Sequence, residues 1–520
     1  MQSNKSATKR ISATLIISVL AMAINYVISF ALTPYITTHI GTEAYGFVSL
    51  AKTVSNYGII ITGCLNAFAS RYITIAYHKE ELKKAKCYFS SVVIANIALV
   101  FVMIILEIFF IWKIEWFIKI PQSLLKDVKI LFALDIINYM LLALANTFVA
   151  SAYIKNQLDK IEIIKLIAYF VEALALVAFY KFFSPKIYYV GIALLGSTII
   201  LGCGNFILSK KLTPELKISR KYFSWGAVKD LVISGIWNSV NSVGNLLNSG
   251  LDLWVSNLML SATSMGELSI VKTVSTILST LEQLISRPFQ PYLLKQYSKN
   301  NSVELIKIFN FEIKFSGYIS SMICAGLLCF GKVYYKLWTP TQNIDLLYGI
   351  TAVTAIGFLF EGMVQPLFYT YTLTLKNKIP CYVTIASGFL NVVGMYFLLK
   401  YTHLQLYAVV GTTTVLGFIT FCIFTPLYTS YCLKVKWNVF YFSIIRVIVS
   451  AGITTVILNV IFRNHMPLSW LGMAGVVIIS CIIGIFIFSI VVLNKNEMQM
   501  LISQIIRLKN RLSIKGENRK

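Results

Sequence analysis

Hydrophobic residues follow one another along this chain in long runs, separated by short polar stretches. Each run holds roughly 20 residues, enough to cross a bilayer as a helix. Transmembrane strands would need shorter segments in which apolar and polar residues alternate, and such segments are absent. The pattern therefore predicts an all-α integral membrane protein of about 14 transmembrane helices. The predicted spans are 13–37, 45–72, 88–112, 128–151, 161–183, 187–209, 230–258, 266–294, 310–331, 346–372, 379–399, 406–432, 441–462 and 469–493.

Two of these spans are copies of one pattern, 220 residues apart. The segment SLAKTVS at 49–55 recurs as SIVKTVS at 269–275. The copies are the second and the eighth span, a shift of six spans. Because this number is even, both halves have the same orientation and are related by an axis along the membrane normal. The paired positions are Asn25 with Asn245, Ser29 with Ser249, Gly46 with Gly266, Lys52 with Lys272 and, at an offset of 216, Arg71 with Arg287.

The repeat predicts two pseudo-symmetric six-helix lobes around a central cavity, followed by two further helices. The basic linker and the basic tail are expected to lie as helices on the inner membrane surface. The predicted parts are an N-terminal lobe at 1–209, a basic linker at 210–229, a C-terminal lobe at 230–432, two last spans at 433–495 and a basic amphipathic cytoplasmic tail at 496–520.

Composition agrees with a membrane protein, and the position of the charges explains their excess. Hydrophobic residues make up 57% of the chain and charged residues 13%, so a soluble globule is excluded. The net charge of +25 would fit a nucleic-acid partner. With the N-terminus inside, however, the inner segments hold about 29 Lys and Arg and the outer loops about 10. The charge therefore predicts topology and attraction to anionic membrane lipids, with both termini cytoplasmic and no nucleic-acid partner.

Residues for metal, redox or covalent chemistry form no recognisable group. The nine cysteines show no CxxC spacing, and the four histidines are scattered near loops. Neither a catalytic residue nor a metal site nor a cofactor is therefore expected. The N-terminus carries Lys5, Lys9 and Arg10 before a full-length apolar span, which is unlike a cleavable signal peptide.

Polar residues recur at helical spacing within four of the predicted spans, the first, second, seventh and eighth. In the seventh span, five polar positions follow at steps of 3, 4, 3 and 4, which places them on one helix face. Amides are unfavourable in hydrocarbon unless they meet water or a partner, so we expect a wet cavity. The alternative is hydrogen bonding between packed helices. The predicted cavity residues are Asn25, Asn66, Asn238, Asn241, Asn245, Asn248, Gln283 and Gln290.

Charged residues within the same spans suggest an anionic cargo. Arg71, Arg287, Lys52 and Lys272 would bind phosphate oxygens, for which arginine offers a planar fork and lysine a mobile charge. The alternative is that these side chains reach the lipid head groups without function. Three acidic residues are candidates for ion coupling, and a structural salt bridge is the alternative for each. They are Glu282, Asp252 and Glu361.

Three segments near the N-terminus resemble a known family. They are LTPYI at 32–36, HIGTEAYGF at 39–47 and NAFASRY at 66–72. They are similar to bacterial polysaccharide flippases of the O-antigen (Wzx) type, in the superfamily that also holds multidrug and toxin extruders and lipid II flippases. The resemblance is strongest over residues 10–90.

The resemblance implies an activity, a location in the cell and partner proteins. It implies ion-coupled alternating access that moves an undecaprenyl-pyrophosphate-linked oligosaccharide (an O-antigen, capsule or exopolysaccharide repeat unit) from the inner to the outer leaflet of the bacterial cytoplasmic membrane. Proton and sodium both remain open as the coupling ion. A glycan polymerase and chain-length machinery are possible partners. The pyrophosphate would lie on the four cations Arg71, Arg287, Lys52 and Lys272.

Two other functions were weighed against a flippase. A multidrug or cation antiporter of the same fold would be expected to have a cavity dominated by carboxylates, whereas the stripes here are rich in amides and net basic. A membrane glycan polymerase or ligase would need catalytic groups at the outer surface. The outer loops are short and present no such group, so we expect a protein that is not an enzyme.

Overall fold

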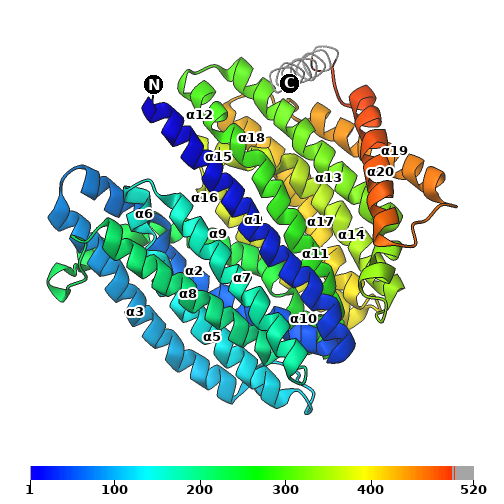
Figure 1. Cartoon of the computed structure of the whole chain (residues 1–520). Coiled ribbons are helices and arrows are strands. Elements are labelled where there is room, and N and C mark those ends of the chain that lie inside the picture. Colours follow the sequence, from blue (N-terminus) through cyan, green and yellow to red (C-terminus); the bar gives the residue numbers. More distant parts are fainter. Residues whose placement is uncertain (1, 495–496, 498–520) are drawn as a thin grey trace, which may run out of the picture. The chain divides into compact units, whose positions relative to one another are not determined.

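The computed structural model describes residues 2–494 and residue 497, and the described part is helical throughout (Figure 1). It divides into two compact units. Unit 1 comprises Met1–Val274 and Lys378–Val409, and unit 2 comprises Ser275–Asn377 and Val410–Lys520. These units are defined by packing and do not test the lobes expected from the repeat, which stay a prediction. The predicted tail at 496–520 lies outside the described residues except for Glu497.

Unit 1 is built from the first ten α-helices, one later helix and the beginnings of two more. Within it, α5 packs along α8, α8 along α7, α7 along α1, α2 along α9 and α9 along α16 (Figure 1). Its elements are α1 (Gln2–His39), α2 (Thr42–His78), α3 (Leu82–Trp112), α4 (Ile114–Phe117), α5 (Leu125–Thr147), α6 (Ala150–Ile154), α7 (Leu158–Phe182), α8 (Tyr188–Leu212), η1 (Arg220–Tyr222), α9 (Trp225–Asn245), η2 (Leu246–Gly250), α10 (Asp252–Met259), α16 (Lys378–Tyr401) and the first residues of α11 (Ala262–Ser286) and α17 (Leu406–Phe418).

Unit 2 holds the remainder of α11 and α17 and the other C-terminal helices. Here α13 packs against both α14 and α19, and α19 packs against α20. Its further elements are η3 (Arg287–Phe289), α12 (Gln290–Ser298), α13 (Ser302–Trp338), α14 (Ile344–Val364), η4 (Gln365–Phe368), α15 (Tyr369–Leu373), η5 (Ile419–Phe424), α18 (Thr425–Leu433), α19 (Tyr441–Phe462) and α20 (Trp470–Val491).

Three helices of unit 2 are capped at their N-termini by polar side chains, which accept hydrogen bonds from backbone N–H groups of the first turn. The Asn301 side chain accepts from Glu304 N at 3.1 Å at the start of α13. Asn343 does the same for α14 at 3.2 Å, and Ser469 for α20 at 3.2 Å. Each cap satisfies a donor that the first helical turn leaves unpaired and so fixes where the helix begins.

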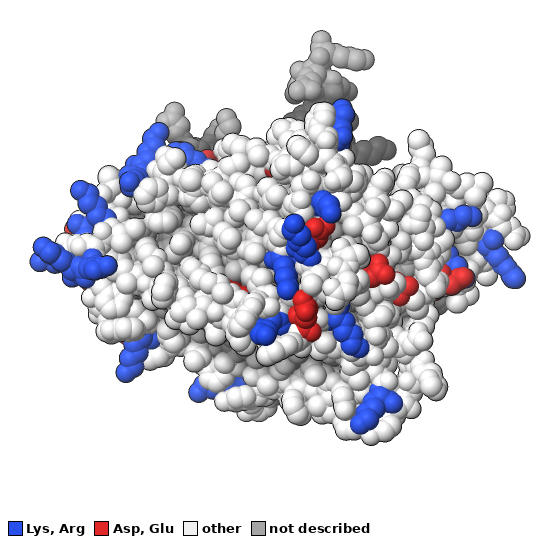
Figure 2. Space-filling view, turned by 90° about the horizontal axis from the view of Figure 1, so that it is seen from below, with Lys and Arg blue, Asp and Glu red and all other residues white. Residues whose placement is uncertain are grey.

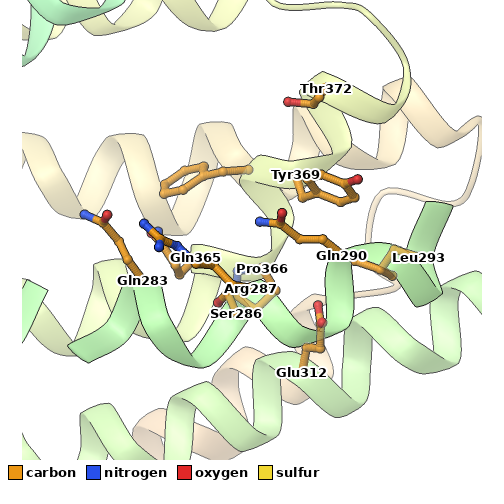
Figure 3. Close-up of a pocket in the computed structure, with 11 residues that line it drawn as sticks. Gln283, Ser286, Arg287, Gln290, Leu293, Glu312, Gln365, Pro366, Tyr369 and Thr372 are labelled. Atoms are coloured by element: carbon orange, nitrogen blue, oxygen red, sulfur yellow. The ribbon is translucent and has the colours of Figure 1, made fainter. Parts of the chain in front are cut away.

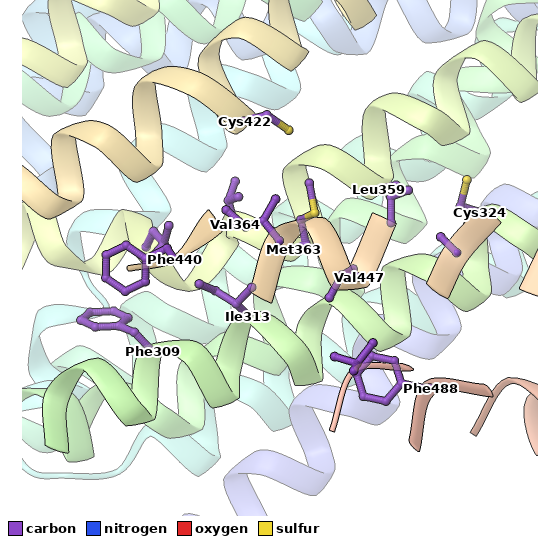
Figure 4. Close-up of a cluster of buried hydrophobic side chains, with 14 of the residues drawn as sticks. Phe309, Ile313, Cys324, Leu359, Met363, Val364, Cys422, Phe440, Val447 and Phe488 are labelled. Carbon is purple, nitrogen blue, oxygen red and sulfur yellow. The ribbon is translucent and has the colours of Figure 1, made fainter. Parts of the chain in front are cut away.

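The core of unit 2 lies where α13, α14 and α19 meet (Figure 4). Phe309 and Phe440 are fully buried, with their ring centroids 6.2 Å apart and nearly perpendicular. Met363 and Val447 extend the same cluster along the helices. This apolar contact fixes α13, on which two polar residues discussed below lie.

The outward faces of many helices are apolar, as expected of a protein surrounded by lipid. On α20, Ile482, Phe486 and Ile490 follow one another at steps of four, and each is more than 60% exposed. On the face drawn in Figure 2, charged side chains gather near the centre and at the margins, and uncharged residues cover the rest. Apolar surface of this extent is unfavourable in water, so these faces suit hydrocarbon.

Twelve helices among the described residues are long and apolar enough to span a membrane, and a bent pair in α2 makes up to 13. This result confirms an all-helical membrane protein, although with fewer qualifying spans than the fourteen predicted. The range 230–258 accounts for the difference. It is helical as predicted, as α9, η2 and α10, but its asparagines and glycines leave it less apolar than the other spans.

Two pairs of positions that the 220-residue offset equates lie against each other in unit 1. The Thr263 hydroxyl donates to Glu43 Oε1 at 2.8 Å. A Cβ added to Gly46 would come within 2.9 Å of the Gly266 backbone, and one added to Gly266 would overlap the carbonyl oxygen of Thr42. Close backbone contact of this kind requires glycine. Contact between equated positions is expected where an axis relates two copies.

Candidate functional site

Helix α2 presents a polar, cationic face that the rest of unit 1 leaves exposed. Lys52 and Asn56 are exposed one helical turn apart in the first half of the helix, and Arg71 is exposed in the second half. The helix bends by 59° between its halves Thr42–Gly58 and Thr62–His78. Since a charged side chain is unfavourable in lipid, this face suits water or a polar ligand.

Helix α9 presents a second polar face, and it ends earlier than the sequence predicts. Asn238, Asn241 and Asn245 are exposed on one side of the helix. The chain then forms a π-helical turn, η2, whose extra residue rotates everything that follows. The predicted row of five is therefore split, with three amides on the exposed face and two polar groups elsewhere.

Two of the predicted cavity residues use their amides to join helices. Asn248 donates to the carbonyl oxygens of Gly244 and Thr384, both at 2.9 Å, and accepts from Ser387 at 3.0 Å. It thereby fixes η2 to α16. Asn66 exchanges hydrogen bonds with Asn96 of α3, the shorter at 2.8 Å. In both cases the amide serves helix packing, the alternative that the sequence had left open.

Lys272 and Asp252 form an ion pair inside unit 1. Lys272 Nζ lies 3.0 Å from Asp252 Oδ2 and also donates to the carbonyl oxygen of Ser249. Asp252 is almost fully buried, 4% exposed, whereas Lys272 is partly exposed. The pair makes Lys272 a structural cation and gives Asp252 a fixed partner.

The part of the repeat in unit 2 lines a cavity of about 270 Å³ (Figure 3). Arg287 opens the 3₁₀ turn η3 just before Pro288, at the break between α11 and α12. Arg287 is exposed and makes no ion pair with the described residues. The walls come from α11, η3, α12, α13, η4 and α15, and they consist of Gln283, Ser286, Arg287, Gln290, Leu293, Glu312, Gln365, Pro366, Phe368, Tyr369 and Thr372.

Glu282, on the face of α11 next to that cavity, is buried among small residues of unit 2. It is 3% exposed and accepts a hydrogen bond from Ser320 of α13 at 3.2 Å. A Cβ on Gly362 of α14 would overlap both Glu282 and Ser320, so glycine leaves the space for the carboxylate. Glu361 is partly buried and close enough to interact electrostatically with Glu282. The remaining predicted residue, Asn25, lies partly buried on α1 of unit 1.

Three buried carboxylates that make no ion pair with the described residues were missed by the sequence analysis, in addition to Asp127, which is paired with Lys186. Asp135 of α5 is 3% exposed and accepts from Ser55 at 2.7 Å. Glu172 of α7 is 4% exposed, and both carboxylates lie within electrostatic reach of Lys52. Glu312 of α13 is 1% exposed. Asp135 is the lone acid of its predicted span, and that signal alone could have marked it, whereas span 161–183 also holds Glu162 and Glu312 lies at the edge of span 310–331.

Comparison with known proteins places the chain by sequence and by fold. A family model described as polysaccharide biosynthesis protein matches residues 12–293. An uncharacterized membrane protein, EpsK of Bacillus subtilis (strain 168), is 28% identical over 501 residues, which cover 95% of this chain and 98% of that protein.

Two solved structures share the fold at low sequence identity. The lipid II flippase MurJ in an inward closed conformation matches with a TM-score of 0.64 and 13% identity, covering 93% of this chain and 99% of that one. An inward-facing multidrug resistance MATE family transporter of the MOP superfamily also gives a TM-score of 0.64, at 13% identity over 82% of this chain and 99% of that one. At this identity the match describes the fold and not the cargo.

Proposed function

Because the chain belongs to the polysaccharide biosynthesis protein family, we propose that it is a flippase for lipid-linked oligosaccharides. The family and the fold are those of transporters, not of enzymes. The proposed cargo is an undecaprenyl-pyrophosphate-linked repeat unit, moved from the inner to the outer leaflet of the bacterial cytoplasmic membrane. Both termini would be cytoplasmic, and the lobes would be those expected from the repeat.

The main observation behind the proposal is cationic and amide side chains left exposed on helices of membrane-spanning length. Arg71 and Lys52 lie on such a face of α2, and Arg287 lies at the wall of a cavity in unit 2. Arginine can bind phosphate oxygens through two parallel hydrogen bonds. A pyrophosphate group is therefore the chemistry that these positions suit best.

The exposed amides of α9 offer a second polar face, suited to neutral groups. Asn238, Asn241 and Asn245 offer donors and acceptors that match sugar hydroxyls. Lys272 is the least suited of the four predicted head-group residues because Asp252 already neutralises it. We assign pyrophosphate binding to Arg71, Arg287 and Lys52, with Glu282 and Glu361 as the groups that would carry a coupling ion.

The proposal is tested in cells that lack their own flippase and contain the matching lipid-linked glycan. Surface glycan and inner-leaflet precursor are measured for the wild type, Arg71→Ala and Arg287→Ala at equal membrane abundance. A hydrogen bond to a charged group contributes about 1.5–3 kcal/mol, so we expect export to fall by about 10- to 100-fold. The matched control is Arg220→Ala, in the short helix η1 of the linker.

The possible outcomes separate the candidate functions. Restored surface glycan in the wild type and accumulated precursor in both variants support the flippase. Equal export by all variants would mean that the arginines only reach the lipid head groups. Efflux of a cationic dye by the wild type without any glycan export would instead favour an antiporter of the same fold.

A further inference from the structure

The cavity in unit 2 contains a carboxylate for which pyrophosphate binding has no use. Glu312 lies on α13 and lines the cavity opposite the break that carries Arg287 and Gln290 (Figure 3). It is 1% exposed, and neither side-chain oxygen has a hydrogen-bond partner among the described residues. A buried carboxylate without partners is strongly unfavourable, so a donor from outside the protein would satisfy it.

The neighbours of Glu312 on α13 have partners of their own. Two residues further on, the buried Lys314 donates to both oxygens of Glu497 at 2.8 Å. Four residues further on, the Ser316 hydroxyl donates to the Glu312 backbone carbonyl, at 2.8 Å, and not to its side chain. Among the described residues, therefore, neither Lys314 nor Ser316 donates a hydrogen bond to the Glu312 carboxylate.

Apart from Glu312 and the cationic Arg287, the polar groups in the wall are neutral and can both donate and accept. Gln283, Gln290 and Gln365 each bring an amide oxygen and an amide nitrogen to the cavity. Phe368 and Tyr369 add flat apolar surface beside them. Such a wall suits a ring that carries several hydroxyls around its edge and apolar C–H groups on its faces.

The positions of Arg287 and Glu312 determine how such a ligand would be oriented in the cavity. Phosphate oxygens are attracted to Arg287 but accept hydrogen bonds and do not donate them, so an inorganic anion would leave the Glu312 carboxylate unsatisfied. A hydroxyl or an amide N–H, in contrast, would donate to it. The volume of about 270 Å³ is just below the range of roughly 300–1,000 Å³ that small-molecule sites occupy, which suits one ring and not a whole oligosaccharide.

We propose that this cavity, the Glu312 pocket, binds the first sugar of the cargo, the one attached directly to pyrophosphate. Glu312 accepts hydrogen bonds from the sugar, the glutamines bond to its remaining polar groups, and Arg287 holds the adjoining phosphate. The inference rests on the proposed flippase function and adds a specificity element to it. The pocket would distinguish sugar-bearing lipid from the bare carrier lipid.

The test measures binding of four lipids to the full-length purified protein in detergent. They are undecaprenyl pyrophosphate and the same lipid with one glucose, galactose or N-acetylglucosamine residue. We expect at least one sugar-bearing lipid to bind the wild type about tenfold more tightly than the bare lipid, which corresponds to about 1.4 kcal/mol. Glu312→Gln should abolish this gain and leave binding of the bare lipid unchanged, and Arg287→Ala should weaken all four.

Two further variants keep the result unambiguous. Glu304→Gln is the matched control, because Glu304 lies on the same helix but its side chain is 45% exposed and is paired with Lys307. It should bind like the wild type. Gln365→Leu alters the opposite wall without touching Glu312, and it should reduce the sugar gain even if Glu312→Gln were poorly folded.

Each contrary outcome overturns a different statement. Equal binding of all four lipids by the wild type would reject the sugar pocket and leave the flippase proposal standing. A sugar gain that survives both Glu312→Gln and Gln365→Leu would place sugar recognition elsewhere. Failure of the wild type to bind any of the four lipids would reject the proposed function, and the pocket with it.

Discussion

The two copies of the repeat carry the same cations in different surroundings. Lys272 is paired with Asp252, whereas Lys52 is exposed and makes no ion pair with the described residues. The sequence explains the difference, because the position equivalent to Asp252 is Leu32. The repeat thus keeps the place of a charge along its helix, while residues that are not repeated decide what that charge contacts.

The arginines differ in the same manner. Arg71 lies on a continuous turn of α2, whereas Arg287 begins a 3₁₀ turn that Pro288 enforces, and lines a cavity. At the offset of 216 the equivalent of Pro288 is Tyr72. One copy therefore offers an exposed cationic face on α2, and the other places its arginine in the wall of a cavity.

The largest expected effect concerns the contact between the two copies at Gly46 and Gly266. Gly266→Val would place a side chain on the carbonyl oxygen of Thr42, and this backbone atom cannot easily move away. We expect a loss of stability of about 3 kcal/mol or more and a matching loss of glycan export. The measurements are the midpoint of thermal unfolding in detergent and surface glycan. Gly452→Val is the control, since a Cβ there meets nothing within 4 Å, and equal loss in both variants would contradict the prediction.

The contrast between the two lysines predicts that substitution by alanine mainly destabilises the protein at Lys272 and mainly reduces export at Lys52. Lys272→Ala leaves the buried Asp252 uncompensated and should destabilise the protein by about 3 kcal/mol. The double variant Lys272→Ala/Asp252→Asn should recover much of this loss. Lys52→Ala should lower the unfolding midpoint much less, because Lys52 is exposed and only within electrostatic reach of Asp135 and Glu172, and it should reduce export. A destabilisation by Lys52→Ala as large as that by Lys272→Ala would show that the two environments are equivalent after all.

A third difference is the acid in one copy where the other has a hydroxyl. Glu282 is equivalent to Thr62, which bonds to the Tyr139 hydroxyl at 2.9 Å. Gly362→Ala should displace the Glu282 carboxylate at a cost of about 1–3 kcal/mol in unfolding free energy. Export should also become less dependent on the ion gradient if Glu282 carries the ion. Gly326→Ala, whose Cβ would meet nothing within 4 Å, is the control.

The smallest expected effect concerns the linker between the copies. Burial would raise the pKa of Glu215, but the hydrogen bond from Tyr77 and the charge of Lys155 more than offset it, so the pKa is lowered. A lowered folded-state pKa gives stability that is present above the usual value of 4.5 and lost as the pH falls through the folded pKa. Tyr77→Phe should therefore flatten the fall of the unfolding midpoint below about pH 4.5. An unchanged acid profile would contradict this role of Tyr77.

The sequence predicted the fold because each apolar run is a complete signal for one helix. It also predicted the exposed amides of α9, whose spacing is a local property. It could not predict that Asn66 and Asn248 serve packing, because their partners belong to α3 and α16, far away in the chain. The role of Glu312 was hidden for another reason. The span predicted from hydropathy, 310–331, begins only two residues before Glu312. Helix α13 begins at Ser302, so Glu312 lies well inside the helix.

The contact between Gly46 and Gly266 has a consequence for the history of the chain. Two copies of one position touch each other only on the axis of an isologous pair. The contact thus resembles the interface of a homodimer. Duplication and fusion of the gene would place both sides of such an interface in one polypeptide. Before such a fusion, a single substitution at that glycine would have altered both sides of the contact at once. After it, each side can diverge alone, which is the freedom that the unlike surroundings of the lysines and arginines display.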